Sequence, residues 1–251
     1  MTIDKPLQRA ILLRRYKRFL AEVKLESGEI VTVHCPNPGS MLGCNKAGSA
    51  VIISDSGNPR RKLRWTLEMV HTNGTWVGVH PNLANDIVVE AIEQGWLPEL
   101  SGYAAIEREI KIGSDTRIDL RLADHPAKIN QACYVEIKNV TLVVNGTALF
   151  PDAQTARGRK HLRKLAKIAA AGQRAVMTYC IPHGGAERFA PAAMIDPEYA
   201  EILTEVHARG VEILPYVANV KPDGEIRLVR RVPLSLELSN LPDMTSLIAS
   251  C

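Results

Sequence analysis

Two acidic residues and a lysine have the types and spacing of a metal site that hydrolyses phosphodiesters. Asp119 lies in an alternating segment, 117–122, and Glu136 and Lys138 share one face of the segment 133–138. Side chains of a strand alternate between faces, so neighbouring strands can bring the two acids together with the lysine beside them. Two adjacent carboxylates repel unless a cation lies between them. The pattern therefore predicts that all three residues are catalytic and that the two acids are metal ligands.

Mg²⁺ or Mn²⁺ is the cofactor expected at this site. Mg²⁺ prefers oxygen ligands and typically uses one or two carboxylates together with waters and phosphate oxygens. The ion would polarise the scissile phosphate, and Lys138 would orient the attacking water or neutralise developing charge. We expect a further carboxylate from either Glu90 or Glu109. The alternative is an ordinary solvated sheet face, because outward charges on alternating strands are common.

The segments around these residues predict an α+β chain of two domains. Residues 1–82 contain about five short alternating segments, which are typical of a small β-barrel. Residues 83–240 alternate strands with helices and predict a mixed sheet flanked by helices. A long helix is expected between Asp152, as its N-cap, and Ala171. Residues 241–251 are taken as a tail.

Clustered positive charge predicts an anionic partner. The chain has 31 Lys and Arg residues against 27 Asp and Glu, a net charge of only +4, but the basic residues occur in clusters. Such clusters create local positive potential that suits an anionic polymer. The residues expected to bind DNA are Arg14, Arg15, Lys17, Arg18, Arg157, Lys160 and His161. The alternatives are a soluble amphipathic helix around Arg157 and a hydrogen-bonded core position for His161.

The compartment expected from the sequence is the cytoplasm. No stretch approaches the roughly 20 apolar residues that span a bilayer, so no membrane partner is expected. The first residues lack the apolar run of a signal peptide, and five irregularly spaced cysteines indicate reduced thiols. Oligomeric state is left open.

In several motifs the chain resembles the sugar fermentation stimulation protein family over about residues 10–235. The matching motifs are HCPNPGSM at 34–41, TRIDL at 116–120, YVEIKNVTL at 134–142, FPDA at 150–153 and RGRKHL at 157–162. The resemblance implies an N-terminal OB-like domain, a C-terminal domain of the PD-(D/E)XK nuclease type, and DNA binding. It also implies a bacterial protein linked to sugar or maltose utilisation. Two departures are the segment YKRF at 16–19, in place of an RNRF-like segment, and Leu120, in place of phenylalanine.

Two functions follow from this pattern. The first is a divalent-metal-dependent nuclease that binds DNA largely without regard to sequence. The second is a non-catalytic, regulatory DNA-binding protein that retains a nuclease-like fold. The acids do not discriminate between them, because a retained site need not turn over.

Overall fold

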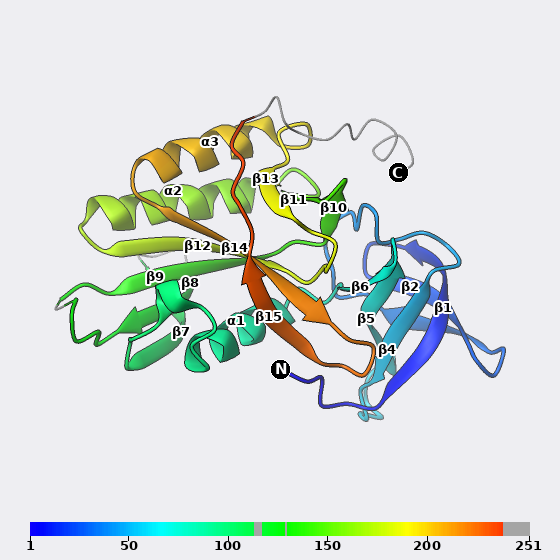
Figure 1. The fold of residues 1–251 in the computed structure, drawn as a ribbon. Helices are drawn as coiled ribbons and strands as arrows, with labels where there is room; N and C mark the ends of the chain where they lie inside the picture. The colour runs from blue at the N-terminus through cyan, green and yellow to red at the C-terminus, as the bar shows by residue number, and fades with distance from the viewer. Residues whose placement is uncertain (113–116, 129, 238–251) are drawn as a thin grey trace.

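The N-terminal strands form a closed OB-type barrel in the computed structural model, which describes residues 1–112, 117–128 and 130–237. Strands β1 to β5 curl round so that β3 pairs with β2 on one side and, through His34 and Thr66, with β5 on the other. This confirms the expected barrel, which lies at the right of Figure 1. Its strands are β1 (Leu7–Tyr16), β2 (Leu20–Leu25), β3 (Ile30–His34), β4 (Ala50–Asp55), β5 (Trp65–Thr72) and β6 (Thr75–Gly78).

The C-terminal half contains a mixed six-stranded sheet in the order β15-β14-β12-β9-β8-β7. Strands β9, β12 and β14 run parallel, whereas β7, β8 and β15 pair antiparallel with their neighbours. The sequence Gly-Ser-Asp-Thr at 113–116 predicts a turn that joins β7 to β8, and these residues lie outside the described part of the chain. The strands are β7 (Ala105–Lys111), β8 (Arg117–Ala123), β9 (Cys133–Asn139), β12 (Arg174–Ile181), β14 (Glu212–Val220) and β15 (Ile226–Arg231).

Helices cover both faces of this sheet, as expected. In Figure 1, α2 (Ala156–Ala170) and α3 (Pro197–Ala208) lie over one face and α1 (Leu83–Glu93) lies under the other. A 3₁₀ turn, η1 (Pro98–Leu100), follows α1. A smaller sheet joins β10 (Leu142–Val144), β11 (Thr147–Phe150) and β13 (Arg188–Pro191) beside the main one. Within the described residues, no helix combines the length and apolarity needed to cross a membrane.

The N-cap of α2 differs from the expected one. Thr155, not Asp152, occupies the cap position, and its hydroxyl accepts a hydrogen bond from the backbone N–H of Gly158 at 3.0 Å. A threonine hydroxyl suits this role because it satisfies one of the unpaired N–H groups of the first turn. Leu162 and Leu165 then lie at helical spacing on the buried face of α2. The helix is thereby anchored at the end nearest the two predicted acids.

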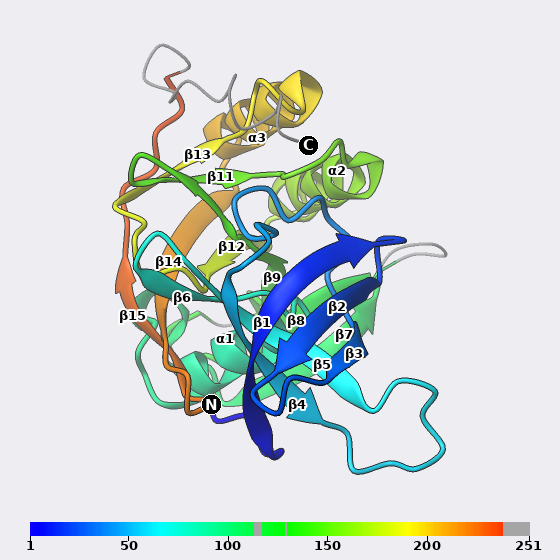
Figure 2. The same cartoon turned by 90° about the vertical axis from the view of Figure 1, so that its right-hand side faces the viewer.

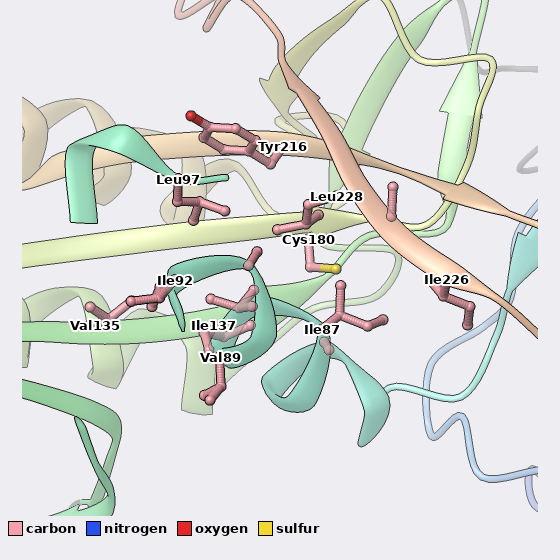
Figure 3. Packing of buried hydrophobic residues seen from close by; sticks show 14 of the residues in the cluster. Ile87, Val89, Ile92, Leu97, Val135, Ile137, Cys180, Tyr216, Ile226 and Leu228 are labelled. Atoms are coloured by element: carbon pink, nitrogen blue, oxygen red, sulfur yellow. The ribbon is translucent and has the colours of Figure 1, made fainter. Parts of the chain in front are cut away.

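The hydrophobic core of the C-terminal domain has one cluster on each side of the sheet. Below the sheet, Ile87 and Ile92 of α1 pack with Val135 and Ile137 of β9 (Figure 3). Above it, side chains of α2 and α3 pack against β12 and β14. These clusters hold α1 and α2 against β9, the strand that contains Glu136.

The barrel is joined to the C-terminal domain through its last strand. The N–H of Gly78 in β6 donates to the carbonyl of Pro182 at 3.0 Å, and Val77 forms a β-bridge with His183. With the view turned by 90°, the barrel lies in front of the larger sheet (Figure 2). The barrel is therefore attached to the larger domain through β6 and the Pro182–His183 segment.

Candidate active site

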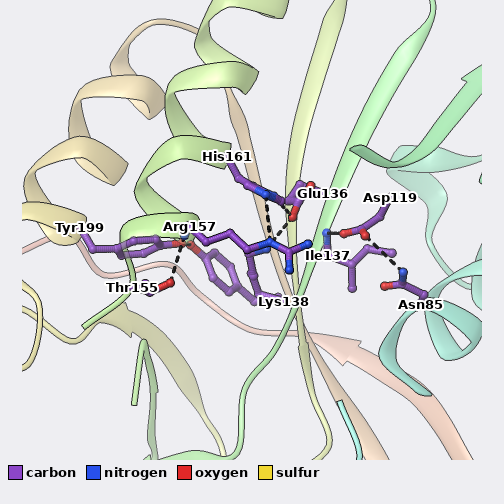
Figure 4. Close-up of polar contacts among 11 residues, drawn as sticks. Asn85, Asp119, Glu136, Ile137, Lys138, Thr155, Arg157, His161 and Tyr199 are labelled. Atoms are coloured by element: carbon purple, nitrogen blue, oxygen red, sulfur yellow. Dashed lines mark hydrogen bonds and ion pairs between the residues drawn. The ribbon is translucent and has the colours of Figure 1, made fainter. Parts of the chain in front are cut away.

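The predicted acids lie where the main sheet opens. Pairing between β8 and β9 ends at Leu120 and Val135, and the next position in register places Asp119 opposite Glu136. Beyond this point the Asp119 side chain takes the place of a backbone acceptor. Its Oδ2 accepts a hydrogen bond from the backbone N–H of Ile137 at 2.8 Å. Its Oδ1 accepts a hydrogen bond from Asn85 of α1 at 3.3 Å (Figure 4). The Asp119 carboxylate is therefore fixed in the gap between the two strands.

Glu136 is almost fully buried and only half satisfied. One of its carboxylate oxygens, Oε1, accepts a hydrogen bond from Lys138 Nζ at 2.5 Å and bonds His161 Nδ1. The other oxygen, Oε2, is buried and has no hydrogen-bond partner among the described residues. Buried carboxylate oxygens without a partner are rare and costly in native proteins. An oxygen of this kind is suited to a cation.

His161 links Glu136 to Arg157. The Nε of Arg157 donates to His161 Nε2 at 3.4 Å, which leaves Nδ1 as the ring nitrogen that donates to Glu136. The two residues are four apart on α2 and therefore lie on one face of the helix. Figure 4 shows Arg157 extending from α2 toward the strand that bears the acid. Such a relay orients a carboxylate that binds a metal.

The two acids have opposite electrostatic environments. Burial raises the pKa of Asp119, and the negative charge of Glu136 raises it further. Burial also opposes ionisation of Glu136, but Lys138 and His161 outweigh it, and the pKa of Glu136 is lowered. One carboxylate is thus held ionised while its neighbour disfavours a second negative charge. A bound cation would relieve that conflict.

A cavity of about 790 Å³ opens over the two acids. Its floor includes Asp119, Glu136 and Lys138, and its walls come from both domains. The barrel contributes Arg18 and Phe19 from the tip of the β1–β2 hairpin, together with residues 36–39. The C-terminal domain contributes the start of α1 and residues 149–158, including Arg157. The structure therefore brings the three predicted catalytic residues into one cleft between the domains.

The two candidates for a further carboxylate occupy different places. Glu109 lines the cleft and lies opposite Asp119 in the register of β7 and β8. Its φ of 56° lies in the left-handed region although β7 continues through it, and Nη1 of Arg117 lies 3.7 Å from its carboxylate. Glu90 instead forms an ion pair with the amino group of Met1 and does not line the cleft.

The basic residues predicted in the barrel divide into two groups. Arg14 forms an ion pair with Glu22, and the three hydrogen bonds of Arg15 go to backbone carbonyls of residues 37, 39 and 40. Lys17 and Arg18 are exposed at the hairpin tip, and neither side chain bonds another described residue. The second pair thus has no competing ion pair within the described part of the chain, and Arg18 lines the cleft. Lys160 is exposed on α2 but is not among the lining residues.

Asp152 joins the barrel to the cleft. Its Oδ2 accepts the N–H of Met41 at 3.0 Å and the hydroxyl of Ser40 at 3.2 Å, and Gly39 packs directly against the carboxylate. This contact, like that of Asn85, was not predicted. No pattern in the sequence pairs positions 112 residues apart.

Family models match both halves of the chain. The description "Sugar fermentation stimulation protein RE domain" matches residues 82–224, and "SfsA N-terminal OB domain" matches residues 13–79. A sugar fermentation stimulation protein homolog of Geotalea uraniireducens is 50% identical over 89% of this chain and 95% of its own length. The homolog of Thermosynechococcus vestitus is 46% identical over 87% and 91%. The solved structure of Pyrococcus furiosus SfsA in complex with Ca²⁺ has a TM-score of 0.84 at 27% identity, covering 94% of this chain and 98% of that one.

Proposed function

Because this chain belongs to the sugar fermentation stimulation protein family, we propose that its cleft binds DNA and hydrolyses phosphodiester bonds with a divalent metal ion. The observation that supports this most directly is the buried, unpartnered Oε2 of Glu136 beside Asp119 at the base of the cleft. The domain with these acids is proposed to be of the PD-(D/E)XK nuclease type. The proposed boundary between the domains lies near residue 82, and the proposed compartment is the cytoplasm.

The donor set fits a hard divalent ion. Asp119 and Glu136 offer carboxylate oxygens, which Mg²⁺ and Mn²⁺ accept and which Ca²⁺ also favours. The structure of Pyrococcus furiosus SfsA is a complex with Ca²⁺, which supports a divalent ion at this fold. Among the described residues, no group of three or more His, Cys, Asp or Glu side chains is placed to hold a metal ion. Two carboxylates completed by water and phosphate oxygens are the usual arrangement for Mg²⁺.

Each residue then has a distinct role. The ion would polarise the phosphate and lower the pKa of a bound water. Asp119 and Glu136 would hold it, and His161 fixes the orientation of Glu136. Lys138, only 17% exposed and hydrogen-bonded to Glu136, places a positive charge where the phosphorane develops negative charge. Arg157, at the rim of the cleft, steadies a phosphate by a charge-assisted hydrogen bond.

DNA is the proposed substrate, recognised through its backbone. Arg18 from the barrel and Arg157 from α2 both line the cleft and so place a cation from each domain near the acids. Guanidinium groups bind phosphate without regard to base identity, which predicts largely sequence-independent binding. Binding should therefore weaken steeply as the salt concentration rises.

The test compares cleavage and metal binding in matched variants. Wild type should cleave labelled DNA with Mn²⁺ and not with EDTA, and it should bind Mn²⁺ in a calorimeter. Asp119→Asn and Glu136→Gln should lose both properties. Glu107→Gln, which removes an exposed carboxylate of β7 that pairs with Arg121 and does not line the cleft, should retain both.

Two results would change the proposal. Cleavage that persists in both acid variants would show that another site or a contaminant is responsible. Salt-sensitive DNA binding without cleavage would instead support the second hypothesis, a non-catalytic DNA-binding protein with a nuclease-like fold.

A further inference from the structure

The tip of the β1–β2 hairpin presents an aromatic ring to the cleft. Phe19 is 44% exposed and lines the same cavity as the two acids, although it belongs to the other domain. Its backbone is held on both sides, because its N–H donates to the carbonyl of Lys17 at 2.6 Å and its carbonyl accepts the N–H of Cys35 at 2.8 Å. The ring is thus presented by a fixed backbone, which lowers the entropy that a ligand must remove.

The turn before Phe19 contains two exposed cationic residues, Lys17 and Arg18. Lys17 and Arg18 have φ values of 47° and 63°, in the left-handed region that non-glycine residues rarely occupy. Such a backbone is costly and often occurs at functional sites. Tyr16, the last residue of β1, pairs with Leu20. Residues 17–19 therefore form the tight turn and lie outside the strand pairing. The ring of Phe19 and the side chain of Arg18 therefore both line the cleft, whereas Lys17 is exposed at the tip and does not line it.

The dimensions of the cleft suit one strand of nucleic acid. A volume of about 790 Å³ is within the roughly 300–1,000 Å³ of sites for small molecules, which is room for a short piece of a single strand. A duplex is bulkier, because it presents two strands across a major groove about 12 Å wide. Glu136 is only 1% exposed, so a phosphate must also reach the floor of the cleft.

We propose that the cleft accepts single-stranded DNA, with a base stacked on Phe19 and the adjoining phosphate held by Arg18, while the strand passes over Asp119 and Glu136. OB-folds commonly bind single strands by combining a basic groove with aromatic side chains on which bases stack. This inference rests on the proposed function, since it names the substrate form for that same site. Phe19 is then a specificity-determining residue, and it lines the same cleft as the acids from the other domain.

The experiment measures binding of one sequence in two forms. A fluorescein-labelled single strand and the corresponding duplex are titrated with the full chain in Ca²⁺, and anisotropy gives the affinity. Wild type should bind the single strand more tightly than the duplex. Phe19→Ala should weaken single-strand binding about 5- to 150-fold, the range expected when one stacked base loses its partner, and leave duplex binding unchanged.

Two further variants separate stacking from a general loss of structure. Phe19→Trp keeps a stacking surface and should retain wild-type affinity and the quenching of a 2-aminopurine base in the strand. Ile30→Ala removes another exposed apolar side chain of the barrel, at the opposite end of the β2–β3 pair, and should change nothing. Thermal melting should be unaltered in both Phe19 variants, because the ring is exposed.

The outcomes distinguish this inference from the function on which it rests. Equal or tighter binding of the duplex, or an unchanged single-strand affinity in Phe19→Ala, would overturn the single-strand proposal. If the duplex is nevertheless cleaved with Mn²⁺, the proposed nuclease function stands and only its substrate form is wrong. If neither form of DNA binds, both proposals fail together.

Discussion

The junction between the domains should make stability fall in mild acid through His183. This side chain is 3% exposed, and its Nδ1 accepts the N–H of Gly185 at 3.1 Å. The acceptor nitrogen must be unprotonated, so the imidazole is neutral with its proton on Nε2. Burial lowers the pKa of His183 from 6.5 to about 4. Protonation would place a charge in the interior and remove the hydrogen bond.

The magnitude follows from the two pKa values. Between pH 6.5 and about 4 the unfolded chain binds a proton at this histidine that the folded chain does not, so stability rises with pH. The contribution is complete above 6.5 and is lost as the pH falls toward 4. The pKa of His183 differs between the unfolded chain, at 6.5, and the folded chain, at about 4. At about 1.4 kcal/mol for each pKa unit, this difference corresponds to about 3 kcal/mol of unfolding free energy.

Chemical denaturation across this pH range measures the effect. Wild type and His183→Gln are compared, since glutamine offers an acceptor to Gly185 but does not titrate. Other groups contribute equally to both proteins, so the difference between the two pH profiles isolates the histidine. Wild type should lose stability more steeply below pH 6.5. Parallel profiles would show that His183 is not the buried neutral base described above.

Three substitutions test the contacts that build the cleft. Gly39→Ala should lower the unfolding free energy by about 1–3 kcal/mol in thermal melts, because the new Cβ would lie 2.4 Å from Asp152 Oδ2; an unchanged melt would contradict this packing. Thr155→Ala should cost about 1 kcal/mol by removing the N-cap of α2, and Thr155→Ser should restore most of it. Arg15→Ala should cost about 2 kcal/mol in urea titrations because it leaves three carbonyls without their donor. Arg14→Ala, at an exposed ion pair, should change stability little, and equal losses for the two arginines would refute the distinction.

Much of the fold follows from local patterns. Alternating strands, the caps and apolar spacing of the helices, and the glycine turns predict the barrel and the mixed sheet, and both are confirmed. The first strand, Leu7–Tyr16, was not expected, because a bulge between Leu12 and Arg14 breaks the two-residue period that identifies a strand. The short strands Thr147–Phe150 and Arg188–Pro191 were also not expected, because four residues give too little periodicity.

The candidate site is only partly predictable for a similar reason. The types and spacing of Asp119, Glu136 and Lys138 identify them from sequence, since neighbouring strands have simple geometry. Alternation does not predict that β8 and β9 separate between the two acids, so that Asp119 bonds a backbone N–H and Asn85. The separation depends on tertiary contacts that local periodicity does not record. The assignment of Arg15 to backbone carbonyls likewise depends on a loop more than 20 residues away.

The bond between β6 and the Pro182–His183 segment has a consequence for how the molecule folds. Ile52 and Met69 of the barrel share a core cluster with Ile226 of the last strand, so neither half completes its interior alone. Cutting the chain at residue 82 would expose those side chains and leave the Gly78 N–H without its acceptor. The halves should therefore melt in one cooperative transition, and a barrel fragment produced by itself should aggregate or remain partly unfolded.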